Sequence, residues 1–157
     1  MRAEVFSRDV QEFLRCLAAR EVRYVVIGGT AVIYHGYARL TGDVDFLYDC
    51  APPNTERLWA ALGDFWGGSV PAVQGPAELA NPKLVVQFGV PPNRIDLIAS
   101  LEAVPFESAW QARVHESITV AGSTVPVWIL GLADLREAKK HAGRPKDLDD
   151  LDHLRPV

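Results

Sequence analysis

The chain has 157 residues, of which 48% are apolar, and a formal net charge of −4 with a pI near 5.5. This size and apolar content are enough for one core, so we expect a single domain over residues 1–157. The negative charge argues against a protein that coats nucleic acid by bulk electrostatics, so any contact with RNA or DNA would be local. No apolar run approaches the roughly 20 residues that cross a bilayer.

Two further features bear on location. The start Met1-Arg2-Ala3-Glu4 lacks the apolar segment of a secretion signal. Cys16 and Cys50 are isolated and show no CxxC spacing, which is typical of thiols in a reducing compartment. The expected location is therefore the cytoplasm.

The first third of the chain predicts a helix, a strand, a short helix and a second strand. Apolar residues from Val10 to Ala18 recur with helical spacing, and Ser7 or Asp9 is available to cap that helix. Residues 22–27 form a β-branched, nearly continuous apolar run, typical of a strand buried on both faces. A short helix over 30–34, a loop over 35–42 and a strand over 43–48 follow.

The remaining elements are predicted from apolar spacing and turn residues. Asn54 is expected to cap a helix that Gly67-Gly68-Ser69 closes, and residues 70–82 are expected to form an irregular surface loop near the site. The last helix is expected to be anchored by Leu148, Leu151 and Leu154. The other expected elements are strands over 83–89 and 94–100, a short helix over 106–113, a hairpin of 117–120 with 124–129, and helices over 132–142 and 146–154.

Asp43 and Asp45 carry the strongest functional pattern. Side chains at i and i+2 of a strand share a face, so these carboxylates project together while Val44 and Phe46 point into the core. Two parallel carboxylates repel each other unless a cation lies between them, and hard oxygen ligands suit Mg²⁺. The alternative is a solvated strand end or a turn cap. A carboxylate that interrupts a β-forming run costs free energy unless it is satisfied, which favours the metal site.

Asp96 repeats the pattern inside the apolar run Arg94-Ile95-Asp96-Leu97-Ile98. Three carboxylates on adjacent strands could hold two Mg²⁺ ions about 3.5–4 Å apart, the arrangement used for in-line phosphoryl or nucleotidyl displacement. Asp43 and Asp45 would bridge both ions. Asp96 would complete the ion that activates the attacking hydroxyl, and could also accept its proton.

Candidate phosphate-binding groups surround these acids. Gly28, Gly29 and Thr30 lie between a strand and a helix, where backbone N–H groups can approach a phosphate, although a simple tight turn is the alternative. Arg39 could neutralise a triphosphate or be solvated or ion-paired. On the penultimate helix, whichever of Lys139 and Lys140 faces the cleft could bind the β- or γ-phosphate.

The turn that follows this helix supplies two more candidates. Arg144 is a candidate nucleotide-binding residue, and Asp147 could cap the last helix or orient Lys139 or Arg144. Walker A, GxGxxG, GxSxG and HExxH sequences are absent from the chain, so it offers no support for a P-loop, a dinucleotide fold, serine hydrolase chemistry or a structural zinc site.

The segment Val26-Ile27-Gly28-Gly29-Thr30-Ala31, followed by His35-Gly36, Arg39, Thr41 and Asp43-Val44-Asp45, resembles the motif of the nucleotidyltransferase superfamily related to DNA polymerase β. Within that superfamily it is most similar to small bacterial proteins of the AbiEii, or MenT-like type IV toxin-antitoxin, group and to lincosamide nucleotidyltransferases. The later segment from Leu130 to Leu148, with Lys139, Arg144 and Asp147, resembles the second motif of that group.

The resemblance implies an α+β fold with a mixed sheet flanked by helices. It also implies Mg²⁺ or Mn²⁺, a nucleoside triphosphate such as ATP, and transfer of a nucleoside monophosphate to RNA, transfer RNA, a protein or a small molecule with release of pyrophosphate. The motifs place the phosphate loop at Gly28, Gly29 and Thr30, the metal ligands at Asp43, Asp45 and Asp96, and the phosphate lysine at Lys139.

Two other functions remain open from the sequence. The chain could be a binding or regulatory half of a toxin-antitoxin pair, with a cognate toxin or antitoxin as partner and little turnover of its own. Relative to many proteins of the AbiEii group, it lacks a sizeable helical C-terminal region, and its acidic net charge leaves little surface for a polyanionic acceptor. A hydrolase that uses the same metals would need a positioned water in place of an acceptor hydroxyl.

Overall fold

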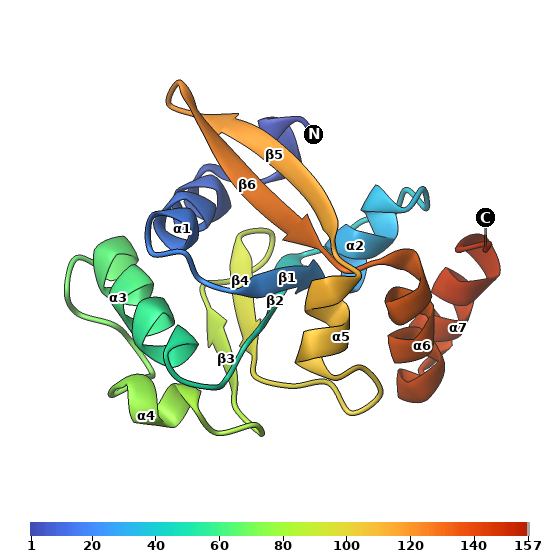
Figure 1. The fold of residues 1–157 in the computed structure, drawn as a ribbon. Helices are drawn as coiled ribbons and strands as arrows, with labels where there is room; N and C mark the ends of the chain where they lie inside the picture. Colours follow the sequence, from blue (N-terminus) through green and yellow to red (C-terminus); the bar gives the residue numbers. More distant parts are fainter. Residues whose placement is uncertain (157) are drawn as a thin grey trace.

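The computed structural model describes residues 1–156 and, over them, shows a mixed six-stranded sheet flanked by helices, which confirms the expected fold class (Figure 1). The elements in chain order are a 3-10 helix (Ala3–Val5), α1 (Arg8–Ala19), β1 (Tyr24–Ile27), α2 (Gly28–Tyr34), β2 (Asp43–Tyr48), α3 (Asn54–Trp66), α4 (Pro76–Leu79), β3 (Val85–Phe88), β4 (Arg94–Ile98), α5 (Phe106–Gln111), β5 (Val114–Val120), β6 (Ser123–Ile129), α6 (Leu132–Ala142) and α7 (Pro145–His153).

The sheet order β3-β4-β2-β1-β6-β5 brings the predicted functional strands together. β2 runs antiparallel to β1 and parallel to β4. In this register Asp45 lies opposite Ile27 on one side and opposite Asp96 on the other, while Asp43 lies opposite Arg94. The end of β1 and the starts of β2 and β4 therefore meet at one end of the sheet.

From Asp43 to Phe46, the side chains of β2 alternate between a polar face and the core, as their spacing predicts. Phe46 is fully buried, and its ring contacts Phe13 of α1 edge-on at a centroid distance of 5.2 Å. Asp43 and Asp45 project from the opposite face. In Figure 1, α1 and α3 lie together at one side of the molecule, and α2, α6 and α7 lie at the other.

The first helix and first strand follow the sequence prediction. The Ser7 hydroxyl accepts a hydrogen bond from the Val10 amide and caps α1, and the predicted apolar stripe of this helix is buried except for the partly exposed Ala18. All four residues of β1 are buried. Among residues 1–156, no helix combines the length and apolar character needed to span a membrane.

Asn54 does not cap its helix, contrary to expectation. Pro53 occupies the N-cap position of α3, and Asn54 is 2% exposed. Its side-chain oxygen accepts from the Arg23 amide at 2.7 Å, and its amide group donates to the backbone oxygens of Arg23 and Asp49. The Asn54 side chain therefore forms hydrogen bonds with buried backbone groups of the two neighbouring loops. A side chain that capped α3 instead could not form these bonds.

Residues 70–82 are largely irregular and exposed, as expected, but their expected place near the site is wrong. This segment contains α4, and Val73 and Leu79 are buried. The Tyr48 hydroxyl donates to the Leu79 carbonyl at 2.8 Å. Because Tyr48 ends β2 and Asp43 begins it, the segment lies at the opposite end of the sheet from the acids. The last hairpin differs less from its prediction, because the only change in β5 is that it begins at Val114 instead of Ser117.

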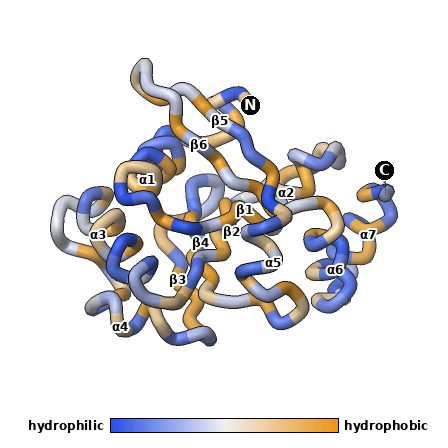
Figure 2. Tube along the Cα trace, in the orientation of Figure 1, coloured by the Kyte–Doolittle hydropathy of each residue, from blue (hydrophilic) through white to orange (hydrophobic). Residues whose placement is uncertain are grey.

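α7 contacts the protein mainly through acids, not through the predicted leucines. Leu148 is 52% exposed, whereas Asp147 and Asp150 are fully buried, and only Leu154 of the predicted anchors is deeply buried. Figure 2 shows hydrophilic stretches along α6, the neighbouring helix. Lys139 of α6 pairs with both buried acids of α7, so the interface between these helices is partly polar, a feature that apolar periodicity does not reveal.

Candidate functional site

Asp43, Asp45 and Asp96 converge as the strand spacing predicts. Each offers one carboxylate oxygen, and these three atoms lie within 4.8 Å of one another. Their convergence follows from the parallel register of β2 and β4, which sets Asp45 directly beside Asp96 on one face of the sheet. We refer to these three residues as the acid triad.

Gly28 makes room for the acid triad. It begins α2 with φ +64°, and a Cβ added there would lie 2.1 Å from Oδ2 of Asp45. A Cβ on Gly29 would lie 2.7 Å from the Thr41 hydroxyl and 3.2 Å from the Arg39 guanidinium. The twin glycines thus let the 39–41 loop and the Asp45 carboxylate approach the start of α2.

Arg94 and Gln87 complete the surroundings of the acid triad, and both were missed from the sequence. The Arg94 guanidinium donates to Oδ1 of Asp96 at 2.9 Å and to Oδ2 of Asp43 at 2.5 Å. Gln87, opposite Asp96 on β3, donates to Oδ2 of Asp96 at 3.2 Å. The spacing of Arg94 and Asp96 at i and i+2 was available in the sequence and predicts a shared face.

Asp45 is the acid with the most perturbed ionisation. Burial raises its pKa, and the carboxylates of Asp43 and Asp96 raise it further, to about 7, while Arg94 opposes this only in part. The carboxyl group of Asp45 is therefore partly protonated at neutral pH when no added cation is present.

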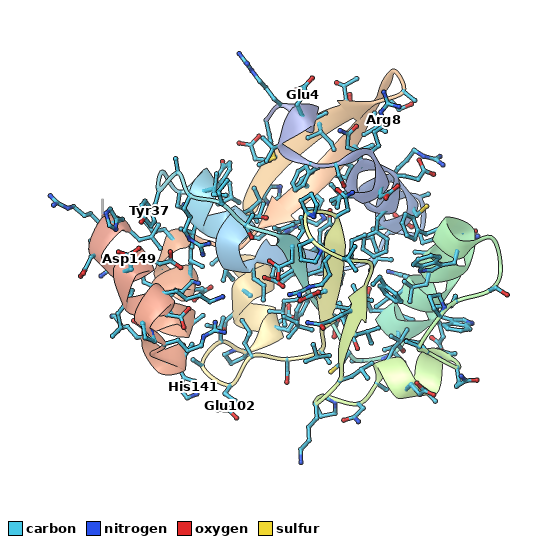
Figure 3. The ribbon with its side chains drawn as sticks, turned by 180° about the vertical axis from the view of Figure 1, so that it is seen from behind. Glu4, Arg8, Tyr37, Glu102, His141 and Asp149 are labelled. Atoms are coloured by element: carbon cyan, nitrogen blue, oxygen red, sulfur yellow. The ribbon has the colours of Figure 1, made fainter. Side chains whose placement is uncertain are left out.

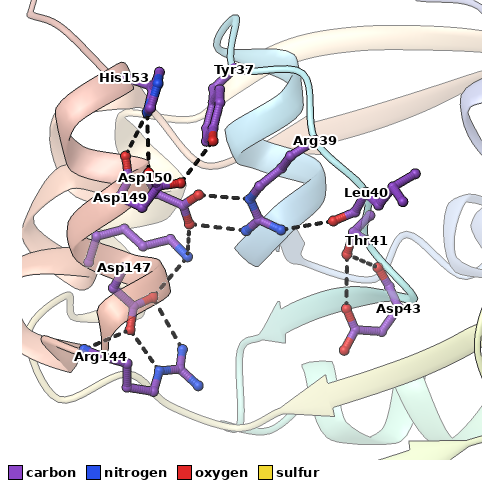
Figure 4. Close-up of polar contacts among 11 residues, drawn as sticks. Tyr37, Arg39, Leu40, Thr41, Asp43, Arg144, Asp147, Asp149, Asp150 and His153 are labelled. Carbon is purple, nitrogen blue, oxygen red and sulfur yellow. Dashed lines mark hydrogen bonds and ion pairs between the residues drawn. The ribbon is translucent and has the colours of Figure 1, made fainter.

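A second polar cluster joins α6 to α7 (Figure 4). The Lys139 ammonium is 7% exposed and lies 3.0 Å from Oδ1 of Asp147 and 2.8 Å from Oδ2 of Asp150. Burial opposes ionisation of both acids, but hydrogen bonds from Arg144 and Lys139 to Asp147, and from Arg39 and Lys139 to Asp150, leave their pKa values lowered. Lys139 is thus held in place by two buried carboxylates.

Arg39 and Arg144 flank this cluster. Arg39 donates to both oxygens of Asp150, at 2.7 and 3.0 Å. Arg39 is therefore ion-paired, one of the alternatives that the sequence left open. Arg144 donates to Asp147 at 2.7 Å, but its side chain is 61% exposed. Asp147 also accepts from the Arg144 backbone amide, so it both caps α7 and contacts the two cations, as the sequence allowed.

A cavity of about 350 Å³ separates the acid triad from this cluster. Its volume falls within the range of small-molecule sites. Outside the cavity, His141 at the end of α6 and Glu102 in the loop after β4 lie together, with Nε2 and Oε2 2.8 Å apart (Figure 3). The cavity is lined by Ile27, Gly28, Gly29, Arg39, Thr41, Asp43, Asp45, Gln87, Arg94, Asp96, Ile98, Leu101, Leu130, Leu135, Ala138, Lys139, Ala142, Arg144, Lys146 and Asp147.

The cavity brings together nearly all of the residues that the sequence nominates. The exception is Thr30, which is 5% exposed and lies beside a different hollow formed with Met1, Val5 and Tyr34. Asp150, fully buried and bonded to Arg39 and Lys139, was missed. Its position three residues after Asp147 places both on one helix face and could have indicated it.

Comparison with known proteins yields one family match. No curated protein matches the chain significantly. A family model described as a nucleotidyltransferase of unknown function (DUF6036) matches residues 8–154, which is most of the chain. The chain therefore belongs to this family of nucleotidyltransferases.

Proposed function

We propose that this protein transfers a nucleoside monophosphate from a nucleoside triphosphate to an acceptor hydroxyl. The acceptor hydroxyl would give its proton to Asp96 and its oxygen would bond to the α-phosphorus, the bond from that phosphorus to the bridging oxygen would break, and pyrophosphate would leave. The observation that carries the proposal is the acid triad, with three carboxylate oxygens within 4.8 Å on the wall of a cavity that also holds cationic side chains.

The donors of the acid triad fit a divalent cation. Carboxylate oxygens suit Mg²⁺ or Mn²⁺, and Gly28 leaves open the space beside Asp45 that a Cβ would fill. Asp43, Asp45 and Asp96 would hold the ion. When bound, such ions stabilise the charge that develops on the attacking and leaving oxygens of an in-line displacement.

The residues of the protein itself would position the nucleotide. The backbone at Gly28 and Gly29 lies at the start of α2 next to the acids, and we assign it to the phosphates, with Thr30 contributing through its backbone. Arg144 and Lys146 are exposed side chains on the cavity wall and suit the outer phosphates. Lys139 and Arg39 would add positive potential from their buried pairs.

The apolar part of the cavity wall suits the nucleobase. Ile98, Leu101, Leu130, Leu135 and Ala138 line the side formed by the sheet and α6. A base needs such a surface to cover its faces, while the charged side receives the phosphates. ATP is the first donor to test, and a requirement for triphosphates agrees with the expected cytoplasmic location.

The resemblance to AbiEii, MenT-like and lincosamide nucleotidyltransferases defines the acceptors to test, which are transfer RNA or other RNA, proteins and small molecules. The same resemblance makes a cognate toxin or antitoxin a candidate partner.

One observation favours a second function, that of a binding or regulatory component with little turnover. Arg94 already pairs with two acids of the triad. If that pairing is permanent, cations are excluded and the fold acts only through its surface.

The test is incubation with α-labelled triphosphates, Mg²⁺ or Mn²⁺ and each acceptor class, comparing the wild type with Asp43→Asn. Asp64→Asn is the matched control, because Asp64 is an exposed acid on α3 that pairs with Arg20. We expect label transfer by the wild type and the control but not by Asp43→Asn. Absence of both metal and nucleotide binding under all conditions would refute the proposal, and a co-purified partner without transfer would favour the second function.

A further inference from the structure

Arg94 occupies the oxygen atoms that a metal ion would need. It binds Oδ2 of Asp43 and both oxygens of Asp96, while Thr41 donates to Oδ1 of Asp43 and Gln87 donates to Oδ2 of Asp96. Every carboxylate oxygen of Asp43 and Asp96 therefore accepts a hydrogen bond from the protein. Asp45 is the member of the triad that has no ion pair within residues 1–156.

This arrangement makes the guanidinium and a divalent cation competitors. Both are positive, and both require oxygens of Asp43 and Asp96, which lie on neighbouring strands at fixed register. Like charges held a few ångströms apart repel, so a cation bound to the triad would weaken the hold of Arg94 on it. The Arg94 side chain is 28% exposed and lines the cavity, so it can turn away from the sheet without unpacking the core.

We propose that Arg94 is the resident counter-cation of the acid triad, and that it releases Asp43 when a divalent cation binds and then binds a phosphate of the nucleotide. The proposal rests on the proposed function, because the triphosphate supplies the anionic oxygens that Arg94 needs after it leaves Asp43. A planar guanidinium forms paired hydrogen bonds with phosphate as readily as with carboxylate.

The consequence is that metal and nucleotide bind together. Metal alone must break the Arg94 contacts without replacing them, so it binds weakly. Metal that arrives with a triphosphate offers Arg94 a new partner, so the two ligands assist each other. This coupling is reciprocal, and couplings of this kind are typically about 5- to 150-fold in affinity.

The test has two titrations. Electron paramagnetic resonance of free Mn²⁺ measures the binding of Mn²⁺ alone to the protein. The second titration measures the binding of the Mn²⁺ complex of α,β-methylene-ATP at saturating Mn²⁺. The variant is Arg94→Gln. Arg20→Gln is the matched control, since Arg20 also pairs with a carboxylate but lies at the exposed surface. In the Arg94→Gln variant we expect Mn²⁺ alone to bind about tenfold more tightly and the nucleotide complex to bind more weakly, a change of opposite sign for the two ligands.

A merely structural role for Arg94 would weaken both ligands together, and that result would overturn the inference. Arg94→Lys provides a second variant, which retains the positive charge but lacks the paired hydrogen-bond donors of the guanidinium. Its Mn²⁺ affinity should fall between those of the wild type and Arg94→Gln. If neither variant binds Mn²⁺ more tightly while the wild type binds the nucleotide complex, the inference alone fails. If the wild type binds neither Mn²⁺ nor the complex, the proposed function fails as well.

Discussion

Replacing Asp45 by Asn should stabilise the metal-free protein at alkaline pH. The carboxyl of Asp45 has its pKa raised from 3.8 to about 7 by burial and by its two acidic neighbours. A raised pKa means that the folded state keeps a proton that the unfolded chain loses, so stability decreases as the pH rises from about 4 to about 7 and then levels off. Each pKa unit corresponds to about 1.4 kcal/mol, so the full penalty is about 4 kcal/mol.

Asn has the same shape and carries no charge, so it removes this penalty. Because part of the proton is shared among the three acids, we expect Asp45→Asn to gain about 2–4 kcal/mol at pH 8 and little at pH 4. Urea unfolding at both pH values, with chelator present, measures the difference. Asp64→Asn, at the exposed pair with Arg20, should change stability by no more than about 1 kcal/mol at either pH.

The reasoning is refuted if Asp45→Asn is as stable as the wild type or less stable at pH 8. It is also refuted if the gain is the same at pH 4 and pH 8, because the mechanism requires the charge of Asp45 to appear between them. Asp45→Asn should abolish Mn²⁺ binding in the same preparation, so the variant would gain stability and lose its proposed ligand.

Three further substitutions test the surroundings of the site. Gly28→Ala should be more destabilising than Gly67→Ala, as measured by thermal unfolding, because both positions have φ +64° but only at Gly28 would the new Cβ meet Asp45; equal losses would contradict this. Asp150→Asn should cost about 3–5 kcal/mol in urea unfolding because it removes a fully buried partner of Lys139 and Arg39, whereas the exposed Asp152→Asn should cost little, and similar effects of the two would count against a buried ion-pair network. Asn54→Ala should cost about 2 kcal/mol or more by removing the partners of the Arg23 amide and the Asp49 carbonyl, and a loss below about 0.5 kcal/mol would show that water replaces the side chain.

The acid triad was predictable because its geometry is local and periodic. Asp43 and Asp45 share a face by spacing alone, and the apolar run around Asp96 indicated a second strand. Arg94 follows the same rule relative to Asp96, yet a lone arginine at a strand start is usually solvated and was overlooked. What the sequence could not supply is the register between β2 and β4, which sets Arg94 opposite Asp43 and depends on the whole sheet.

The buried face of α7 was harder to predict from the sequence, for a different reason. Leucines at 148, 151 and 154 have helical spacing and predict the buried face, but within the helix Asp147 and Asp150 have the same spacing and are buried, while Leu148 is exposed. Their burial depends on cations from distant positions, Arg39 and Lys139, that no local pattern can pair with them. Residues 70–82 were misplaced likewise, since their position depends on Tyr48 at the far end of β2.

α7 is fastened to the segment that leads into Asp43. Asp150 holds Arg39, and the Tyr37 hydroxyl donates to Asp149 at 2.8 Å while its ring stacks on His153 (Figure 4). Only a few residues separate Arg39 from Asp43. A rigid shift of α7 would therefore move the backbone that orients the Asp43 carboxylate. A macromolecule that binds the outer surface of α7 could therefore shift the acid triad without entering the cavity.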